Sequence, residues 1–258
     1  MRTVLAAATL VAALALLGAC TGSSATVSQT TASSAPLPTL APIVSPAPAV
    51  TATSAPGQAP SVIQPTPVVA AVSGLDYPLA GACLPAIDNL MPNAPRLYRA
   101  GIHEGVDFYP GLACAEIVEG TSVLAAEAGA VVRADWGFQE MTVAELDELL
   151  TRSKSQGYTD SAAMDRFRGR QVWIDHGGGI ITRYAHLSGI APGIEVGMTV
   201  QAGQLLSYVG DSGTPEAVTA PGAETHLHFE IRVGESYLGE GLAADEVRAL
   251  LAQAFSNP

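Results

Sequence analysis

Three short motifs carry histidine and aspartate side chains that could bind a metal ion and move protons. They are His103-Glu-Gly-Val-Asp107, Tyr184-Ala-His186-Leu-Ser188 and His226-Leu-His228-Phe-Glu230, and together they hold four of the five histidines. Two imidazoles and one carboxylate leave a zinc ion with net positive charge and an open position for water, which is how catalytic zinc sites are built. The two remaining histidines are then available for proton transfer. The motifs therefore indicate a hydrolytic enzyme.

The His226-Leu-His228 triplet has the alternation of a β-strand. Leu227, Phe229 and Ile231 alternate with polar residues, so one face of this strand is predicted to contact the core. The two histidines then project from the other face, about 6.6 Å apart along the backbone. One of them can bind the metal while the other reaches water or substrate. A His-x-His triplet also occurs by chance on surface strands. It supports a metal site here only together with the other two motifs.

The spacing of His103 and Asp107 requires an irregular backbone. On an ideal strand these residues would lie about 13 Å apart, too far to share one ion. A helix would bring them together, but Gly105 and the β-like Val106-Asp-Phe-Tyr109 segment argue against a helix. We therefore expect a bend at Gly105. The alternative is that Asp107 is an ordinary carboxylate at the end of a strand.

The elements that must position these motifs are mainly β-strands. Short hydrophobic or alternating runs are separated by turn sequences such as Gly177-Gly178-Gly179. This pattern is typical of an antiparallel β-structure with tight turns. The strands are expected within residues 131–134, 171–175, 180–184, 205–209 and 227–233.

Two helices are predicted among these strands. The first opens with the capping-box residues Thr142 and Glu145, followed by leucines on one face, within a charged stretch over residues 136–170. The second covers residues 243–255 and has one apolar stripe. We expect that stripe to pack against the sheet.

The N-terminal residues 1–20 are predicted to be an export signal. Arg2 precedes an uncharged apolar run that is too short for a comfortable membrane span of about 20 residues. The run ends in Leu17-Gly-Ala-Cys20, which resembles the lipobox of bacterial lipoproteins. We therefore expect a lipidated Cys20 and an extracytoplasmic protein anchored to a bacterial membrane. The alternatives are a plain secretory signal and an uncleaved anchor.

Two further segments follow the signal. Residues 21–73 contain no charged side chain and nine of the 18 prolines, which predicts a disordered tether. Residues 74–258 have the size of one domain. The whole chain has a formal net charge of −12 and a single lysine, Lys154. It has no basic patch for nucleic acid, so we expect recognition by a shaped groove.

Cys83 and Cys114 are the only cysteines besides Cys20. Outside the cytoplasm two such cysteines often form a disulfide, which would close a loop of about 30 residues and contribute roughly 3–4 kcal/mol in chain-entropy models. The alternative is a pair of buried free thiols. We do not expect them to be zinc ligands, because the histidine and aspartate set already suffices.

The three motifs, in this order, resemble those of the lysostaphin-type (LytM-domain) zinc endopeptidases of bacterial cell walls. The resemblance extends from Arg99 to Val233 and includes the turn-rich segments 197–203 and 208–213. It implies Zn²⁺ held by His103, Asp107 and His228. It also implies proton transfer and transition-state stabilisation by His186 and His226.

The implied fold is an antiparallel β-sheet sandwich of the duplicated hybrid motif type, here with a helical insertion and a C-terminal helix. The implied reaction is hydrolysis of peptide bonds in the stem or bridge peptides of peptidoglycan. Two other functions stay open: a catalytically silent regulator of another wall hydrolase, and a metal-scavenging lipoprotein.

The sequence departs from the family pattern at two places. The stretch 136–170 is longer than in compact members, so it forms either a wall or lid of the groove or an inert elaboration. The segment upstream of His103, with Met91-Pro-Asn-Ala-Pro95, also lacks the usual pattern. His176 belongs to none of the motifs and is expected to have a structural or surface role.

Overall fold

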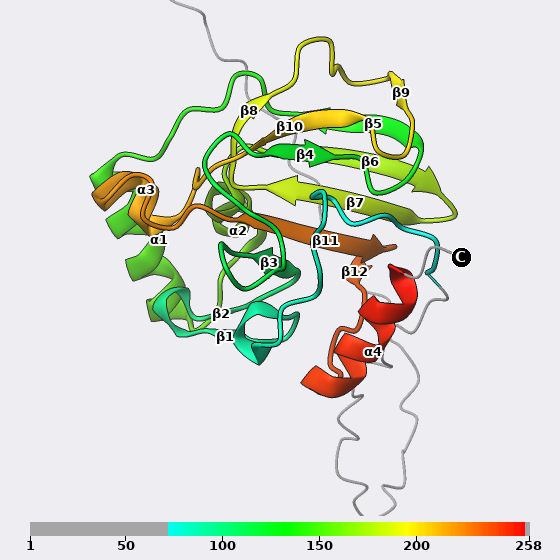
Figure 1. Ribbon diagram of the computed structural model, residues 1–258. Helices are drawn as coiled ribbons and strands as arrows, with labels where there is room; N and C mark the ends of the chain where they lie inside the picture. Colours follow the sequence, from blue (N-terminus) through cyan, green and yellow to red (C-terminus); the bar gives the residue numbers. More distant parts are fainter. Residues whose placement is uncertain (1–71, 256–258) are drawn as a thin grey trace, which may run out of the picture. The chain divides into compact units, whose positions relative to one another are not determined.

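The computed structural model describes residues 72–255 (Figure 1). The predicted signal 1–20 with Cys20, and residues 21–71 of the predicted tether 21–73, lie outside the described residues. Val72 is described and is buried in the core, so the packed domain begins before the predicted residue 74. Within the described part, no helix is both long enough and apolar enough to cross a membrane.

The larger of the sheets has seven strands, all paired antiparallel. Its order is β12-β11-β7-β6-β5-β9, and the short strand β3 pairs with β11 beside this path. The long β11 crosses the molecule between these partners (Figure 1). The strands are β3 Val106–Phe108, β5 Gly129–Ala134, β6 Val172–Gly177, β7 Ile180–Ala185, β9 Thr199–Val200, β11 Leu227–Val233 and β12 Ser236–Tyr237.

Two smaller antiparallel sheets complete the β-structure. One has the order β4-β10-β8, with β4 Ser122–Leu124, β8 Leu187–Ile190 and β10 Leu205–Val209. The other pairs β1 Pro95–Arg96 with β2 Gly101–Ile102.

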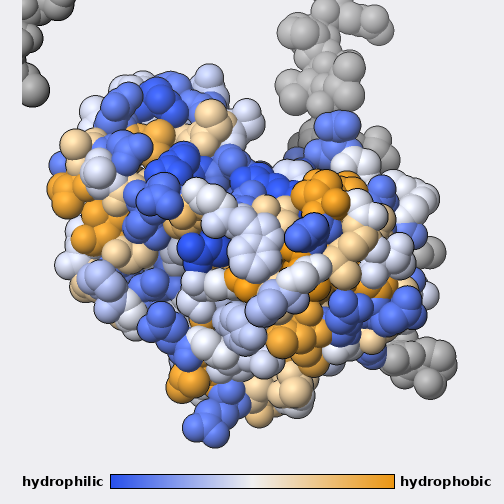
Figure 2. All heavy atoms as spheres, turned by 90° about the horizontal axis from the view of Figure 1, so that it is seen from above, coloured by the Kyte–Doolittle hydropathy of each residue, from blue (hydrophilic) through white to orange (hydrophobic). Residues whose placement is uncertain are grey.

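One hydrophobic core is shared by the larger sheet and the three-stranded sheet. Its side chains come from β3, β4, β6, β7, β10 and β11, which accounts for the alternation in those segments. Representative buried residues are Phe108, Val123, Ile174, Tyr184, Leu206 and Phe229. On the molecular surface, by contrast, hydrophobic residues form separate areas with hydrophilic residues between them (Figure 2).

Four α-helices are present in the described part of the chain: α1 Val143–Gln156, α2 Ser161–Arg168, α3 Pro215–Thr219 and α4 Ala244–Ala254. Helix α1 begins with the predicted capping box, because the Thr142 hydroxyl accepts from the Glu145 N–H and the Glu145 carboxylate accepts from the Thr142 N–H. Helices α1 and α2 share a small separate core that includes Leu146, Leu149 and Phe167. Two 3₁₀ turns, η1 Asp88–Leu90 and η2 Leu97–Arg99, precede β2.

The observed fold confirms the prediction of a mainly β, antiparallel structure with a helical insertion and a C-terminal helix. Helices α2 and α3 were not predicted as separate elements. Four of the eight residues of α2 are polar or charged, and α3 is a turn of only five residues. Neither has enough hydrophobic periodicity to stand out in the sequence.

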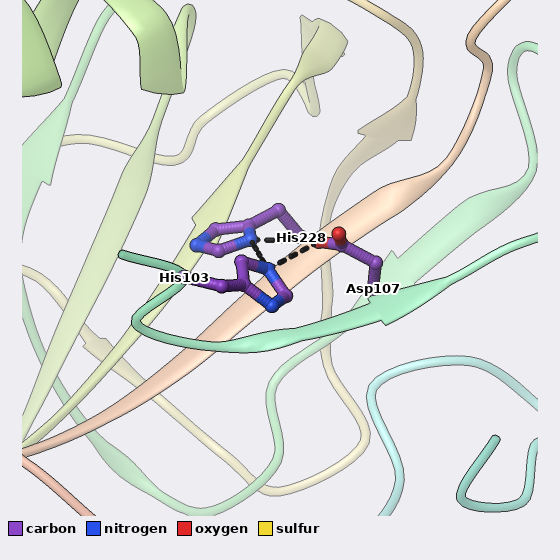
Figure 3. A group of neighbouring side chains, drawn as sticks. All are labelled: His103, Asp107 and His228. Atoms are coloured by element: carbon purple, nitrogen blue, oxygen red, sulfur yellow. Dashed lines mark hydrogen bonds and ion pairs between the residues drawn. The ribbon is translucent and has the colours of Figure 1, made fainter. Parts of the chain in front are cut away.

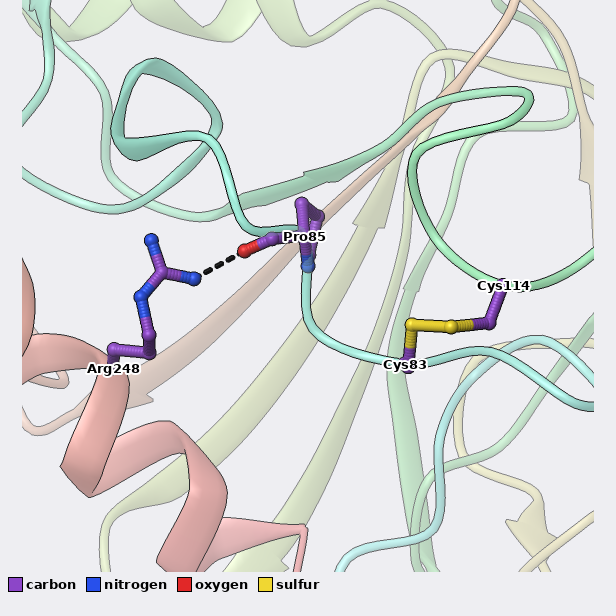
Figure 4. The surroundings of a disulfide bond; sticks show 4 residues. All are labelled: Cys83, Pro85, Cys114 and Arg248. Carbon is purple, nitrogen blue, oxygen red and sulfur yellow. Dashed lines mark hydrogen bonds between the residues drawn. A yellow bond between two sulfur atoms is a disulfide. The ribbon is translucent and has the colours of Figure 1, made fainter.

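A disulfide joins Cys83 to Cys114, as predicted (Figure 4). It ties the start of the described chain to the loop that follows β3. On the other side of the Cys83 segment, the Arg248 guanidinium of α4 donates to the Pro85 carbonyl oxygen. The disulfide and this hydrogen bond therefore fasten the segment that leads towards the 3₁₀ turns.

Candidate metal and catalytic site

The site forms where β11 is paired on both sides. His228 of β11 lies opposite Asp107 of β3 on one side and opposite Ala185 of β7 on the other. His186 directly follows Ala185 and has a left-handed backbone, with φ of 58°. Strand register therefore brings residues from three distant parts of the sequence to one place.

Two histidines and one carboxylate converge there (Figure 3). The Nε2 atom of His103 lies 2.9 Å from Oδ1 of Asp107 and 3.0 Å from Nδ1 of His228. The same Asp107 oxygen lies 2.8 Å from Nδ1 of His228. The expected bend lies between β2 and β3, and it brings His103 and Asp107 together although they are four residues apart.

Gly105 has a steric role at this bend. A Cβ at this position would lie 2.4 Å from the Phe229 carbonyl oxygen and 2.9 Å from Cε1 of His228. Only glycine lets the chain pass this close to β11.

The outer nitrogen of each converging histidine is held by an acceptor. The Nδ1–H of His103 donates to the Met91 carbonyl oxygen at 2.9 Å, and the Nε2–H of His228 donates to Oε1 of Glu230 at 3.0 Å. Because these nitrogens carry the protons, Nε2 of His103 and Nδ1 of His228 are unprotonated and can each offer a lone pair to a metal ion. Two nitrogens and one oxygen that face one point, each with a hydrogen-bonded outer shell, fit a zinc ion.

Glu230 is fully buried and is surrounded by guanidinium groups. Arg168 Nε lies 2.6 Å from its Oε1, and Arg183 and Arg232 lie 3.3 and 3.4 Å from its Oε2. Although burial alone would raise the pKa of Glu230, the charge of Arg168 and the hydrogen bond from His228 hold it well below the ordinary value. Glu230 therefore stays ionised and orients His228.

His186 and His226 lie beside the converging set. Their ring centroids are 4.6 Å apart, and His226 Nε2 is 3.6 Å from Oδ1 of Asp107. The Nδ1–H of His186 donates to the Ser212 carbonyl oxygen at 2.8 Å, and that of His226 donates to the Glu224 carbonyl oxygen at 2.6 Å. In both neutral rings Nε2 is therefore the free, proton-accepting atom.

Burial lowers the pKa of His186 and of His226, so both rings are neutral at neutral pH. Burial also lowers the pKa of His103, to about 4. At His228, the hydrogen bonds to Asp107 and Glu230 outweigh burial and raise the pKa. These directions hold for the metal-free protein, in which a proton can occupy the place between Asp107 and His228.

Several residues of the site were not identified from the sequence. Tyr109 stacks on the His226 ring at 4.2 Å and donates its hydroxyl to Glu224 at 2.5 Å. Arg96 pairs with the outer oxygen of Asp107 at 2.9 Å. Glu230 stands in the quoted motif two residues after His228, a signal that was available. Tyr109 and Arg96 lie outside the functional parts of the motifs, and only the tertiary fold brings them to the site.

A cavity of about 620 Å³ opens onto the site. Its walls are the segment around η2, the ends of α1 and α2, and the start of α3. The stretch 136–170 therefore forms a wall of the cavity. His176 does not line it, and its ring instead bonds to the Ala128 carbonyl oxygen and the Thr182 hydroxyl. Wall residues from the insertion are Leu150, Lys154, Met164, Phe167 and Arg168.

Among curated proteins, the chain is similar over part of its length to a bacterial endopeptidase. This relative is the L-Ala–D-Glu endopeptidase of Bacillus subtilis, 33% identical over 81 residues, which are 31% of this chain and 25% of the relative. The chain thus matches only a quarter of that relative's length.

Solved structures with a similar fold include a zinc-containing peptidase from Vibrio cholerae, at 19% identity and a TM-score of 0.41, covering 65% of this chain and 39% of the other. The catalytic domain of lysostaphin from Staphylococcus simulans is 21% identical, with a TM-score of 0.34, covering 65% of this chain and 84% of the other. The catalytic domain of EnpA from Enterococcus faecalis is 20% identical, with a TM-score of 0.39, covering 64% of this chain and 94% of the other.

The model of one protein family covers more than half of the chain. It matches residues 101–239, which run from β2 to the turn after β12 and contain all three motifs. On this match, the chain belongs to Peptidase family M23.

Proposed function

We propose that the protein is a zinc-dependent metalloendopeptidase that hydrolyses peptide bonds in the stem or bridge peptides of peptidoglycan during remodelling of the cell wall. The observation that carries this proposal is the convergence of His103, Asp107 and His228 beside two further histidines. The curated relative, named for cleavage of an L-Ala–D-Glu bond, supports the choice of substrate.

His103 Nε2, Asp107 Oδ1 and His228 Nδ1 would hold the zinc ion. When bound, zinc supplies Lewis acidity, which acidifies water and polarises a carbonyl group. Glu230 and the Met91 carbonyl keep the two imidazoles in the required tautomers. Arg96 donates to the second oxygen of Asp107, which would leave Oδ1 as the oxygen available to the ion.

His226 would take the proton from the attacking water, because its free Nε2 faces the converging set and Tyr109 fixes its ring plane. The proton that His226 takes would end on the leaving nitrogen as the C–N bond breaks. It would pass there directly or through Nε2 of His186, whose ring lies beside that of His226; His186 protonated at Nε2 would also donate to the developing oxyanion. Both roles need a ring that is neutral at rest, which the lowered pKa values provide.

The zinc assignment is tested by Asp107→Ala. The full chain should bind one zinc ion per molecule, and the variant should lose it, because two imidazoles alone hold zinc weakly. Metal content after dialysis, measured by mass spectrometry, gives the answer. Asp175→Ala, on β6 outside the cavity, is the matched control and should keep its zinc. A full complement of zinc in Asp107→Ala would refute the ligand assignment.

A catalytically silent regulator would bind peptidoglycan or a hydrolase without cleaving. The complete set of ligands and both additional histidines argue for the enzyme instead. For location we propose an extracytoplasmic protein anchored through lipid on Cys20. The lipobox-like sequence and a disulfide typical of oxidising compartments support this.

A further inference from the structure

Arg99, in η2 at the wall of the cavity, is a buried cation without an acidic partner. Its exposed fraction is 5%, and no carboxylate of residues 72–255 pairs with it. Its Nε is buried and has no hydrogen-bond acceptor. Arg168, which lines the same cavity, pairs with both Glu104 and Glu230.

The guanidinium group of Arg99 is nevertheless held in one place. Nη2 donates to the Ile102 carbonyl oxygen at 2.9 Å, and Nη1 donates to the Thr159 hydroxyl at 3.2 Å. Its Cζ lies 5.9 Å from the ring centres of Tyr98 and Phe167. A Cβ at Gly101 would lie 2.1 Å from Nη1, so glycine makes the room.

Such a group lowers the stability of the protein unless an anion compensates it. Burial lowers the pKa of Arg99, and no neighbouring carboxylate opposes that effect. The guanidinium group of Arg99 is held in place but has no carboxylate partner among the described residues. Its remaining N–H groups are therefore available to a ligand in the cavity.

A second cation faces the same cavity. Lys154, the only lysine of the chain, lies on α1, which packs against η2. Its side chain is exposed, and it makes no ion pair within the described part of the chain. Of the acids that line the cavity, Asp107 pairs with Arg96, Glu224 accepts from Tyr109, and Glu216 lies at the start of α3, which also packs against α1. On η2 and α1 themselves, the charges that line the cavity without an ionic partner among residues 72–255 are both positive.

We propose that Arg99 and Lys154 form a subsite that binds a carboxylate of the substrate peptide, outside the bond that is cut. The proposal rests on the endopeptidase function above and narrows its substrate to peptides with a free carboxylate near that bond. The guanidinium supplies charged N–H donors, and the ammonium supplies a second charge from the neighbouring helix α1. Peptides whose carboxylate is amidated are poor substrates.

The test compares soluble peptidoglycan fragments before and after conversion of their carboxylates into primary amides. Binding is measured to the zinc-loaded full chain that carries His226→Ala, so that the fragments stay intact, with mass spectrometry of the retained fragments. The acid forms should bind at least about tenfold more tightly than the amides, as expected for hydrogen bonds to charged groups. Lys154→Met and Arg99→Gln should each remove most of this preference.

Lys154→Met changes an exposed side chain, so it decides the proposal even if Arg99→Gln does not fold. Arg152→Met removes a cation from the same helix outside the cavity and should keep the preference. Equal retention of acids and amides, including no retention of either, overturns the subsite. A preference for the acid fragments that remains in the Lys154→Met variant also overturns the subsite.

Cleavage by the chain without the His226 substitution is measured separately. Cleavage without a preference for acids refutes the subsite alone. A preference for acids without cleavage refutes the endopeptidase function alone.

Discussion

At the scale of single residues, the outer hydrogen bonds of the histidines determine what the site can do. Met91 and Glu230 turn lone pairs of His103 and His228 inward, while Ser212 and Glu224 leave Nε2 of His186 and His226 free. In the proposed function, the same residue type thus serves as ligand or as proton acceptor, according to the group that accepts its N–H.

Glu230→Gln tests the role of the partner of His228. The amide keeps the shape of the carboxylate but lacks the charge that favours the required tautomer and strengthens the imidazole as a ligand. Zinc affinity should fall about 10- to 100-fold, as measured by competition with a chromogenic chelator. Glu235→Gln, on the exposed turn after β11, is the control. An unchanged affinity would show that Glu230 serves only the fold.

The histidine pKa values predict how the metal-free chain responds to acid. An unfolded imidazole titrates near about 6.5, whereas His103 titrates at about 4 in the fold, and the pKa of His226 is also lowered. Below the unfolded value the unfolded chain binds more protons, so stability is lost as pH falls, by up to about 1.4 kcal/mol per pH unit for each group.

His228 has a raised pKa and acts in the opposite sense. Its contribution is fully present below the unfolded value and is lost as pH rises through the folded one, so it adds no slope in the acid window. Urea unfolding at pH 6.5 and at pH 5 should show lower stability at pH 5. Equal or greater stability at pH 5 would contradict the assignment of His103 and His226 as neutral rings.

At the scale of elements, the close approach of the bend to β11 brings His103 and Asp107 to His228. Gly105→Ala would place a methyl group against the Phe229 carbonyl oxygen and the His228 ring. We expect a loss of about 1–3 kcal/mol in the free energy of unfolding, together with weaker zinc binding, because the bend must move. Chemical denaturation and metal titration measure the two effects.

Gly137→Ala provides the matched control, since a Cβ there meets no atom within 4 Å. It should leave both stability and zinc binding nearly unchanged. If Gly105→Ala behaves like this control, the tight packing of the bend does not position the ligands.

Hydrophobic periodicity in the sequence predicted the strands whose side chains pack into the core. The runs 180–184, 205–209 and 227–233 were identified as strands because their short apolar or alternating stretches supply side chains to one core. The β-like character of Val106–Tyr109 indicated the segment that contains β3. Strand β9 has only two residues and is defined by its pairing with β5, so no local pattern can signal it.

At the scale of the whole molecule, the motifs predicted which residues would meet, whereas the walls of the cavity depended on tertiary structure. His103, Asp107, His186, His226 and His228 all lie at one site. Arg99 was not recognised from the sequence, because its lack of an acidic partner is visible only once η2, α1 and α2 are packed together. The stretch 136–170 thus supplies one wall of the cavity.

The central claim is zinc-dependent cleavage, and the most direct measurement is digestion of purified peptidoglycan by the full chain. The released fragments are identified by mass spectrometry, with zinc, with a chelator, and with the His226→Ala variant. We predict newly cleaved peptide bonds that disappear with the chelator and return with added zinc. The variant should bind zinc but cleave at least about 100-fold more slowly. Undiminished cleavage in the chelator, or none with one zinc ion bound per chain, would contradict the account.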